Sequence, residues 1–164
     1  MANYYLNAVP TADIPYNPQA QVVFGRVTVK VTAEQMEADE TVINIAGPFP
    51  AGAVVANAAD WLFTLSDLDT NATPTLAIDF QFSAAAAGTS PDEVINDSAA
   101  GQTGTTDRLD GAEGGTDIAG KYLQALVKTV AATGADGTIA VQYAYRTQPP
   151  LKIVDLTSTT GVAI

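Results

Sequence analysis

Hydrophobic and polar residues alternate along several short stretches of the chain, which is the pattern of strands that bury one face. In residues 22–32 three valines alternate with Thr and Lys, and in residues 75–82 large apolar residues alternate with Ala, Asp and Gln. We expect a further strand at residues 41–45, and either two short strands or one bent strand within residues 53–65. The chain is therefore predicted to be built mainly from short strands.

The last third of the chain shows the clearest pair of strands. Residues 122–132 and 138–147 are rich in β-branched and aromatic residues, and the Gly-bearing stretch 133–137 between them has the length of a hairpin turn. We therefore predict a β-hairpin here. Two prolines then end the second strand, and the tail 149–164 is expected to add an edge strand around residues 151–156.

Residues 84–120 differ in composition from the rest of the chain. They are rich in Ala, Gly, Ser, Thr and Asp and contain few large aliphatic residues. Loops of this length inside a compact domain are uncommon and are usually functional or partly disordered. We interpret the segment as a long loop between strands, with little core of its own.

The first 20 residues are predicted to form an extended arm, because Pro10, Pro15 and Pro18 are spaced too closely for a helix. A frayed terminus is the simpler alternative. Solvated tails rarely combine several tyrosines with so few charges, which favours an arm that lies on its own domain or on a neighbour. The residues expected to make such contacts are Tyr4, Tyr5, Leu6 and Tyr16.

Together these patterns give seven or eight short strands, no long helix and no internal repeat. A short helical turn is expected after Thr32, since Thr32 and Gln35 match a capping box. The predicted fold is all-β, an antiparallel β-sandwich of jelly-roll type. It consists of an arm (1–20), a sandwich domain (21–148) with its long inserted loop, and a C-terminal tail or edge strand (149–164).

Charge and composition narrow the classes of function. A net charge of −11, from 18 acidic and 7 basic residues, disfavours binding to nucleic acid and to anionic membranes. The chain has no His and no Cys, so a Ser-His-Asp triad, a thiol nucleophile and the usual zinc sites cannot be built. We expect a soluble protein without cofactors that is not an enzyme. The N-terminus has no signal-peptide pattern, which is typical of synthesis in a cytoplasm.

Carboxylates are the remaining candidates for chemistry. Asp67 and Asp69 lie in a turn that matches the opening of an EF-hand, but the Gly and the bidentate Glu of such a loop are missing, so this site is excluded. Isolated acids in turns are usually solvated, and we interpret both residues in that way. Weak candidates for a calcium site of another type are Asp107, Asp110, Glu113 and Asp117.

Trp61 is the only tryptophan, and its apolar neighbours predict a core position. If Trp61 were exposed, it could instead anchor a sugar or a partner protein together with Tyr143 or Tyr145. A carbohydrate- or receptor-binding module therefore remains an alternative function.

Three segments carry a resemblance to a known family: Gly47–Val55, Asp67–Phe80 and Ala132–Tyr145. Their order and style resemble the small β-sandwich structural proteins of tailed bacteriophages, most of all the capsid decoration (cement) proteins. The resemblance implies a protein on the capsid surface of the virion, made in the host cytoplasm. It also implies a homotrimer that binds the major capsid protein and stabilises the shell. A tail, fibre or connector component of the same kind of particle is the alternative.

Overall fold

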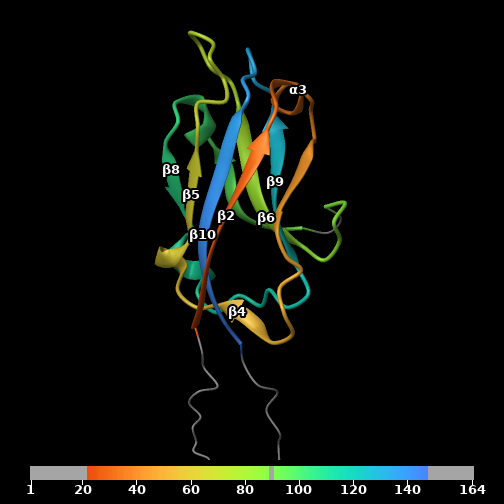
Figure 1. The fold of residues 1–164 in the computed structure, drawn as a ribbon, viewed down its shortest axis with the longest axis vertical. Coiled ribbons are helices and arrows are strands. Elements are labelled where there is room, and N and C mark those ends of the chain that lie inside the picture. The colour runs from red at the N-terminus through yellow and green to blue at the C-terminus, as the bar shows by residue number, and fades with distance from the viewer. Residues whose placement is uncertain (1–21, 89–90, 148–164) are drawn as a thin grey trace, which may run out of the picture.

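The computed structural model describes residues 22–88 and 91–147, which form two antiparallel sheets packed face to face (Figure 1). The first sheet has the order β2-β10-β5-β8, with β4 pairing beside β10, and the second has the order β3-β9-β6-β7. The predicted β-sandwich is thus confirmed. The strands are β2 (Val22–Val31), β3 (Val42–Ala46), β4 (Ala53–Val55), β5 (Leu62–Leu65), β6 (Ala77–Ser83), β7 (Asp92–Ser98), β8 (Thr106–Arg108), β9 (Tyr122–Thr129) and β10 (Gly137–Thr147).

The strand order is that of a jelly roll. If the short β4 is left aside and the other strands are counted in chain order, the sheets read 1-8-3-6 and 2-7-4-5. Successive strands then alternate between the two sheets, apart from the adjacent pair β6 and β7. Such an arrangement of eight strands closes a single core between the sheets.

The core lies between the sheets and is filled from alternate positions of the strands. Phe63 of β5 and Phe80 of β6 meet from opposite sheets with their ring centroids 4.4 Å apart. In β10 the inward residues Ile139 and Val141 are fully buried, as the alternation in the sequence predicts. The hydrophobic pattern therefore identified correctly which face of these strands is buried.

The predicted hairpin of residues 122–147 is wrong, although both of its strands exist. β9 pairs with β3 and β6 in the second sheet, whereas β10 pairs with β2, β4 and β5 in the first. The segment between them crosses from one sheet to the other. Among the described strands, the only chain neighbours that pair with each other are β6 and β7. Turn length alone therefore did not predict the partner, because a short connection can also cross between sheets.

The prediction that residues 84–120 form a loop with little core is also wrong in large part. The segment contains β7 and β8 and two 3-10 turns, η2 (Ala100–Gln102) and η3 (Gly111–Glu113). Its few large aliphatic residues are used in the common core, since Val94, Leu109 and Ile118 are buried there. The strands were missed because β7 (DEVINDS) carries several polar residues at the exposed edge of the sheet.

The polar positions of β6 differ from expectation as well. Asp79 and Gln81 lie on the outer side of the sheet, yet they are buried. The Gln124 amide of β9 accepts a hydrogen bond from Gln81 and donates to the carbonyl oxygens of Ala85 and Ala86 in the stretch after β6. Asp79 accepts the Asp97 amide hydrogen of β7. Polar alternation in this strand thus indicated a second, hydrogen-bonded layer and not a solvated face.

One short α-helix, α3 (Ala33–Met36), follows β2 and has the expected capping box. The Thr32 hydroxyl accepts the Gln35 amide hydrogen, and the Gln35 side chain accepts the Thr32 amide hydrogen. Met36 anchors the turn in the core. Within the described part of the chain, no helix has the length and apolar character needed to cross a bilayer.

Candidate interaction surface

Asp69 is a buried structural carboxylate, so its interpretation as a solvated turn residue is wrong. Its side chain is only 1% exposed, whereas Asp67 in the same turn is exposed. The two carboxylate oxygens accept backbone N–H hydrogen bonds of 2.7 to 3.3 Å, donated by Asn71, Thr75, Leu76, Ala132 and Thr133. The carboxylate therefore fastens the turn before β6 to the crossover between β9 and β10.

Burial by itself raises the pKa of Asp69. The backbone hydrogen bonds from Thr75, Ala132, Thr133 and Leu76 outweigh that effect and lower the pKa to about 2, from an ordinary value of 3.8. All of its donors are main-chain groups of its own domain, which assigns Asp69 to stability. It is not available as a catalytic acid or base.

Each of the four weak metal candidates accepts a hydrogen bond: Asp107 lies in β8, Asp110 and Glu113 lie at the η3 turn, and Asp117 lies in the turn that follows. Asp107 accepts from the Ser98 hydroxyl, Asp110 caps η3 through the Ala112 amide, Glu113 accepts from Thr116, and Asp117 accepts from the Ala119 amide. In the described ranges no three Asp, Glu, His or Cys side chains come close enough to hold a metal ion. These are the hydrogen bonds that carboxylates in turns and at strand ends ordinarily accept.

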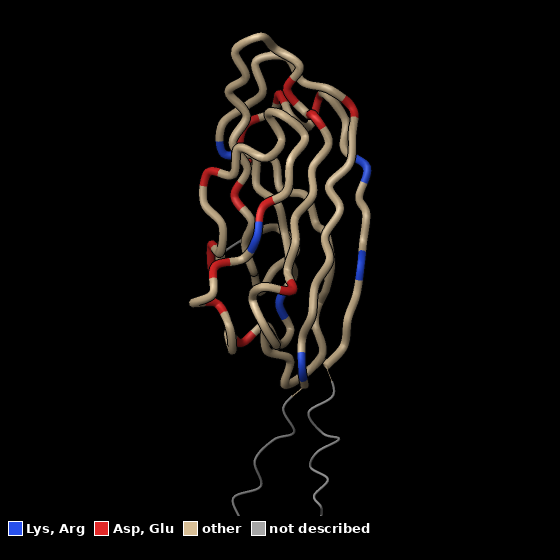
Figure 2. Tube along the Cα trace, turned by 90° about the vertical axis from the view of Figure 1, so that its left-hand side faces the viewer, with Lys and Arg blue, Asp and Glu red and all other residues tan. Residues whose placement is uncertain are grey.

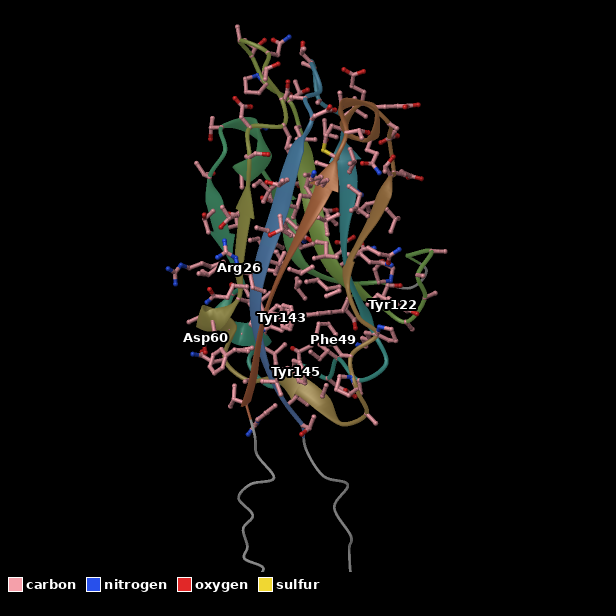
Figure 3. All side chains as sticks on the ribbon, in the orientation of Figure 1. Arg26, Phe49, Asp60, Tyr122, Tyr143 and Tyr145 are labelled. Carbon is pink, nitrogen blue, oxygen red and sulfur yellow. The ribbon has the colours of Figure 1, made fainter. Side chains whose placement is uncertain are left out.

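The aromatic residues of the sugar-binding alternative point into the sandwich. Trp61 is fully buried, and its indole N–H donates a 2.8 Å hydrogen bond to the Ala144 carbonyl oxygen. Phe49 packs against Trp61, Tyr143 and Tyr145 with ring centroids 5.5 to 6.0 Å apart (Figure 3). The core position expected for Trp61 is confirmed, and these rings form no exposed row that could stack on a sugar.

The Tyr143 ring lies directly over Gly25 of β2, which is its partner in the sheet. A Cβ atom at Gly25 would lie 2.2 Å from the tyrosine ring, so a larger residue there would force the ring to move. Tyr143 thus covers the inner side of β2 near its beginning. The outer side of that part of the strand stays open to solvent.

The exposed large hydrophobic residues of the described chain are consecutive at the start of β2. They are Val22, Val23 and Phe24, with exposed fractions of 43, 36 and 65%. Among the described strands β2 lies at the edge of its sheet, so these residues have a described neighbouring strand on one side only. The sequence pattern predicted the strand but not its edge position, which is why this patch could not be found from the sequence.

This apolar patch lies where the two terminal segments join the sandwich. Val22 pairs with Arg146, so β2 begins beside the end of β10. The contact residues expected in the arm, Tyr4, Tyr5, Leu6 and Tyr16, lie outside the described residues, as does the expected edge strand around 151–156. Both segments nevertheless attach at the end of the sandwich that carries Val22, Val23 and Phe24.

The fold has counterparts among solved structures. A chain in the structure of the cyanophage Pam1 capsid asymmetric unit matches with a TM-score of 0.62 and 22% identity, over 79% of this chain and 87% of that chain. A chain in the structure of the Ralstonia phage GP4 capsid matches with a TM-score of 0.55 and 22% identity, over 79% and 86%. No protein-family model matches the sequence, and no curated protein matches it. The sandwich is therefore similar in fold to chains found in two bacteriophage capsids.

Proposed function

We propose that this protein is a structural component of a bacteriophage virion, and that it acts as a decoration protein that binds the capsid shell and stabilises it. The observation that carries the proposal is the jelly-roll fold, which is shared over 79% of the chain with chains of two phage capsid structures. The resemblance of Gly47–Val55, Asp67–Phe80 and Ala132–Tyr145 to decoration proteins points in the same direction. In this role the partner is the major capsid protein, and no catalysis is needed.

The exposed patch of Val22, Val23 and Phe24 supports an interaction role. Aromatic residues are enriched at the centres of protein interfaces, and a Phe that is 65% exposed gains most from being covered by a partner. The arm with its three tyrosines joins the sandwich at the same place. We propose that Phe24 is part of the surface that contacts the shell.

Loading onto capsid shells that lack this protein tests the function. The purified chain is expected to cosediment with the shells in a saturable way and to raise their melting temperature. Phe24→Ser is expected to weaken loading by about tenfold or more, since it removes a central apolar anchor. The unfolding free energy of the Phe24→Ser variant is expected to differ from that of wild type by less than about 0.5 kcal/mol, because the ring is exposed.

Tyr122→Ser is the matched control, because Tyr122 is a partly exposed aromatic residue on the other sheet (Figure 3). It is expected to leave loading unchanged. A wild-type chain that never binds shells under any salt condition would contradict the proposed function. Equal loading by wild type and Phe24→Ser would contradict only the role of the patch.

We further propose that the free protein is a homotrimer held together by the N-terminal arm. Light scattering of the intact chain is expected to give three times the chain mass of 16.9 kDa. A shortened chain that lacks residues 1–20 is expected to give a single chain mass, because the segment proposed to join the three copies is removed. A monomer in both measurements would contradict the trimer and leave the arm as a candidate contact with the shell.

A further inference from the structure

The basic residues of this acidic protein are concentrated on one sheet. Of the six Lys and Arg residues in the described ranges, four belong to the first sheet. They are Arg26 and Lys30 of β2, Arg108 of β8 and Arg146 of β10. Strands β2, β4, β5 and β10 contain no Asp or Glu at all.

These four side chains lie on the outer face of the sheet. Their neighbours Val27, Val141 and Phe63 pack toward the core, and successive side chains of a strand alternate between faces. The register places Arg26 opposite Gln142 and Arg108 opposite Leu62, so the basic groups are spread across the sheet. All four are exposed.

None of the four is neutralised by an ion pair within the described part of the chain. The salt bridge found there joins Lys121 and Asp92, which belong to the side of the second sheet. The one acid in the strands of the first sheet, Asp107, accepts a hydrogen bond from Ser98. An exposed acid, Asp117, bridges to Val54 of β4 in the row of Arg146. The positive charge of Arg26, Lys30 and Arg108 is free to act on an external partner.

The same face also has the shape and composition of a contact surface. Arg26 lines a hollow of about 130 Å³ together with Leu62, Thr64, Ala140 and Gln142. Phe24, with its exposed ring, precedes Arg26 by two residues and so lies in the same outward row of β2. Arginine next to an exposed aromatic ring is typical of protein interfaces.

Most of the acidic residues lie elsewhere on the described surface. The edge strand of the second sheet, β7, carries Asp92, Glu93 and Asp97, and the turn of α3 carries further acids. Figure 2 shows basic segments on the strand at its right-hand edge, and most acidic segments on the left-hand side and at the top. The molecule is thus electrically asymmetric despite its net charge of −11.

We propose that the outer face of the sheet β2-β10-β5-β8, which we term the basic face, is the side that contacts the capsid shell, and that it contacts an acidic protein surface there. The inference rests on the proposed function, which it deepens by assigning the contact face and the charge of the partner. A chain with a charge of −11 is repelled by an acidic surface in most orientations. Only the basic face can approach such a surface, so charge would orient the protein as it binds.

Lys30→Glu and Lys128→Glu form a matched pair for the test. Both lysines are exposed on strands, and each substitution changes the net charge by the same amount. Lys30 lies on the basic face and Lys128 on the outer side of the other sheet. Loading onto shells that lack this protein is measured at low salt and at high salt, with circular dichroism to confirm that each variant is folded.

Lys30→Glu is expected to weaken loading at low salt by about tenfold relative to Lys128→Glu, and the difference is expected to shrink in about 0.5 M salt, where charges are screened. Equal loading by the two variants, with wild type still binding, would overturn the basic face as the contact and leave the proposed function standing. Failure of wild type to bind shells would instead remove the proposed function itself.

Wild type and the two lysine variants also test two other partners for the basic face, namely a second copy of this chain and nucleic acid. A change in solution mass caused by Lys30→Glu, and not by Lys128→Glu, would assign the basic face to contacts between copies of this chain. Binding of wild type to duplex DNA that Lys30→Glu abolishes would assign it to nucleic acid. Either result would overturn the proposal, and both are excluded if the mass is unchanged and DNA is not retained.

Discussion

Asp69→Asn is expected to lower the free energy of unfolding at pH 7 by about 2–4 kcal/mol, although it changes only one atom of the side chain. The carboxylate accepts five backbone N–H groups at a buried position. An asparagine amide can accept through its one oxygen only, and its NH₂ group would face other donors. Chemical denaturation followed by circular dichroism measures the loss.

The effect of this substitution is expected to depend on pH. The pKa of Asp69 is lowered to about 2 in the folded chain, from an ordinary 3.8, so its charge stabilises the fold fully above pH 3.8. As the pH falls from 3.8 to 2, the unfolded chain takes up this proton before the folded chain does, and about 2 kcal/mol of stability is lost. The gap between wild type and Asp69→Asn should therefore narrow by that amount over this range.

Asp67→Asn is the control, because Asp67 is an exposed carboxylate in the same turn. It is expected to change the unfolding free energy by less than about 0.5 kcal/mol at either pH. If Asp69→Asn were no more destabilising than Asp67→Asn, or if its effect were the same at pH 2 and pH 7, the role assigned to the buried carboxylate would be wrong.

Trp61→Ala is expected to cost about 3–5 kcal/mol of unfolding free energy. The indole is fully buried, packs edge-on against Phe82 at 5.5 Å between centroids, and bonds to the Ala144 carbonyl oxygen. Truncation therefore leaves a cavity in the aromatic cluster and removes one of the two hydrogen bonds that the Ala144 carbonyl oxygen accepts, the other being donated by the Ala56 amide. Trp61→Phe should cost less, since it fills much of the space and loses only the N–H donor and the second ring.

Phe24→Ala provides the comparison, because it removes a similar aromatic side chain from an exposed position. All three variants are compared by circular dichroism, since Trp61 is the only tryptophan and its removal abolishes the fluorescence signal. A loss for Trp61→Ala as small as that for Phe24→Ala would show that the aromatic cluster contributes little to the stability of the sandwich.

Local patterns identified most of the strands because burial on one face imposes a period of two on the sequence. The valines of β2, the apolar positions of β6 and the alternation in β10 were all found in this way. β7 escaped because an edge strand with acidic residues has no regular apolar face. The two short strands β4 and β5 were among the alternatives left open for residues 53–65, and the structure selects them.

The pairing of the strands could not be predicted from these local sequence patterns. β9 and β10 each match a strand pattern, but their partners β6 and β2 are far away in the sequence, and the choice depends on how both sheets close on one core. Asp69 illustrates the same limit for a single residue. Its burial depends on Ala132 and Thr133, more than 60 residues later, which the turn sequence around it does not reveal.

The sequence by itself determined the all-β class, the position of most strands, the buried state of Trp61 and the absence of His and Cys chemistry. These properties follow from residue composition and from the local period of two, which need no knowledge of distant contacts. The tertiary structure decided the jelly-roll pairing, the burial of Asp69, the exposed edge position of Phe24 and the gathering of basic side chains on one face. Each of these depends on which distant strands lie side by side, and only the closure of two sheets around a common core fixes that choice.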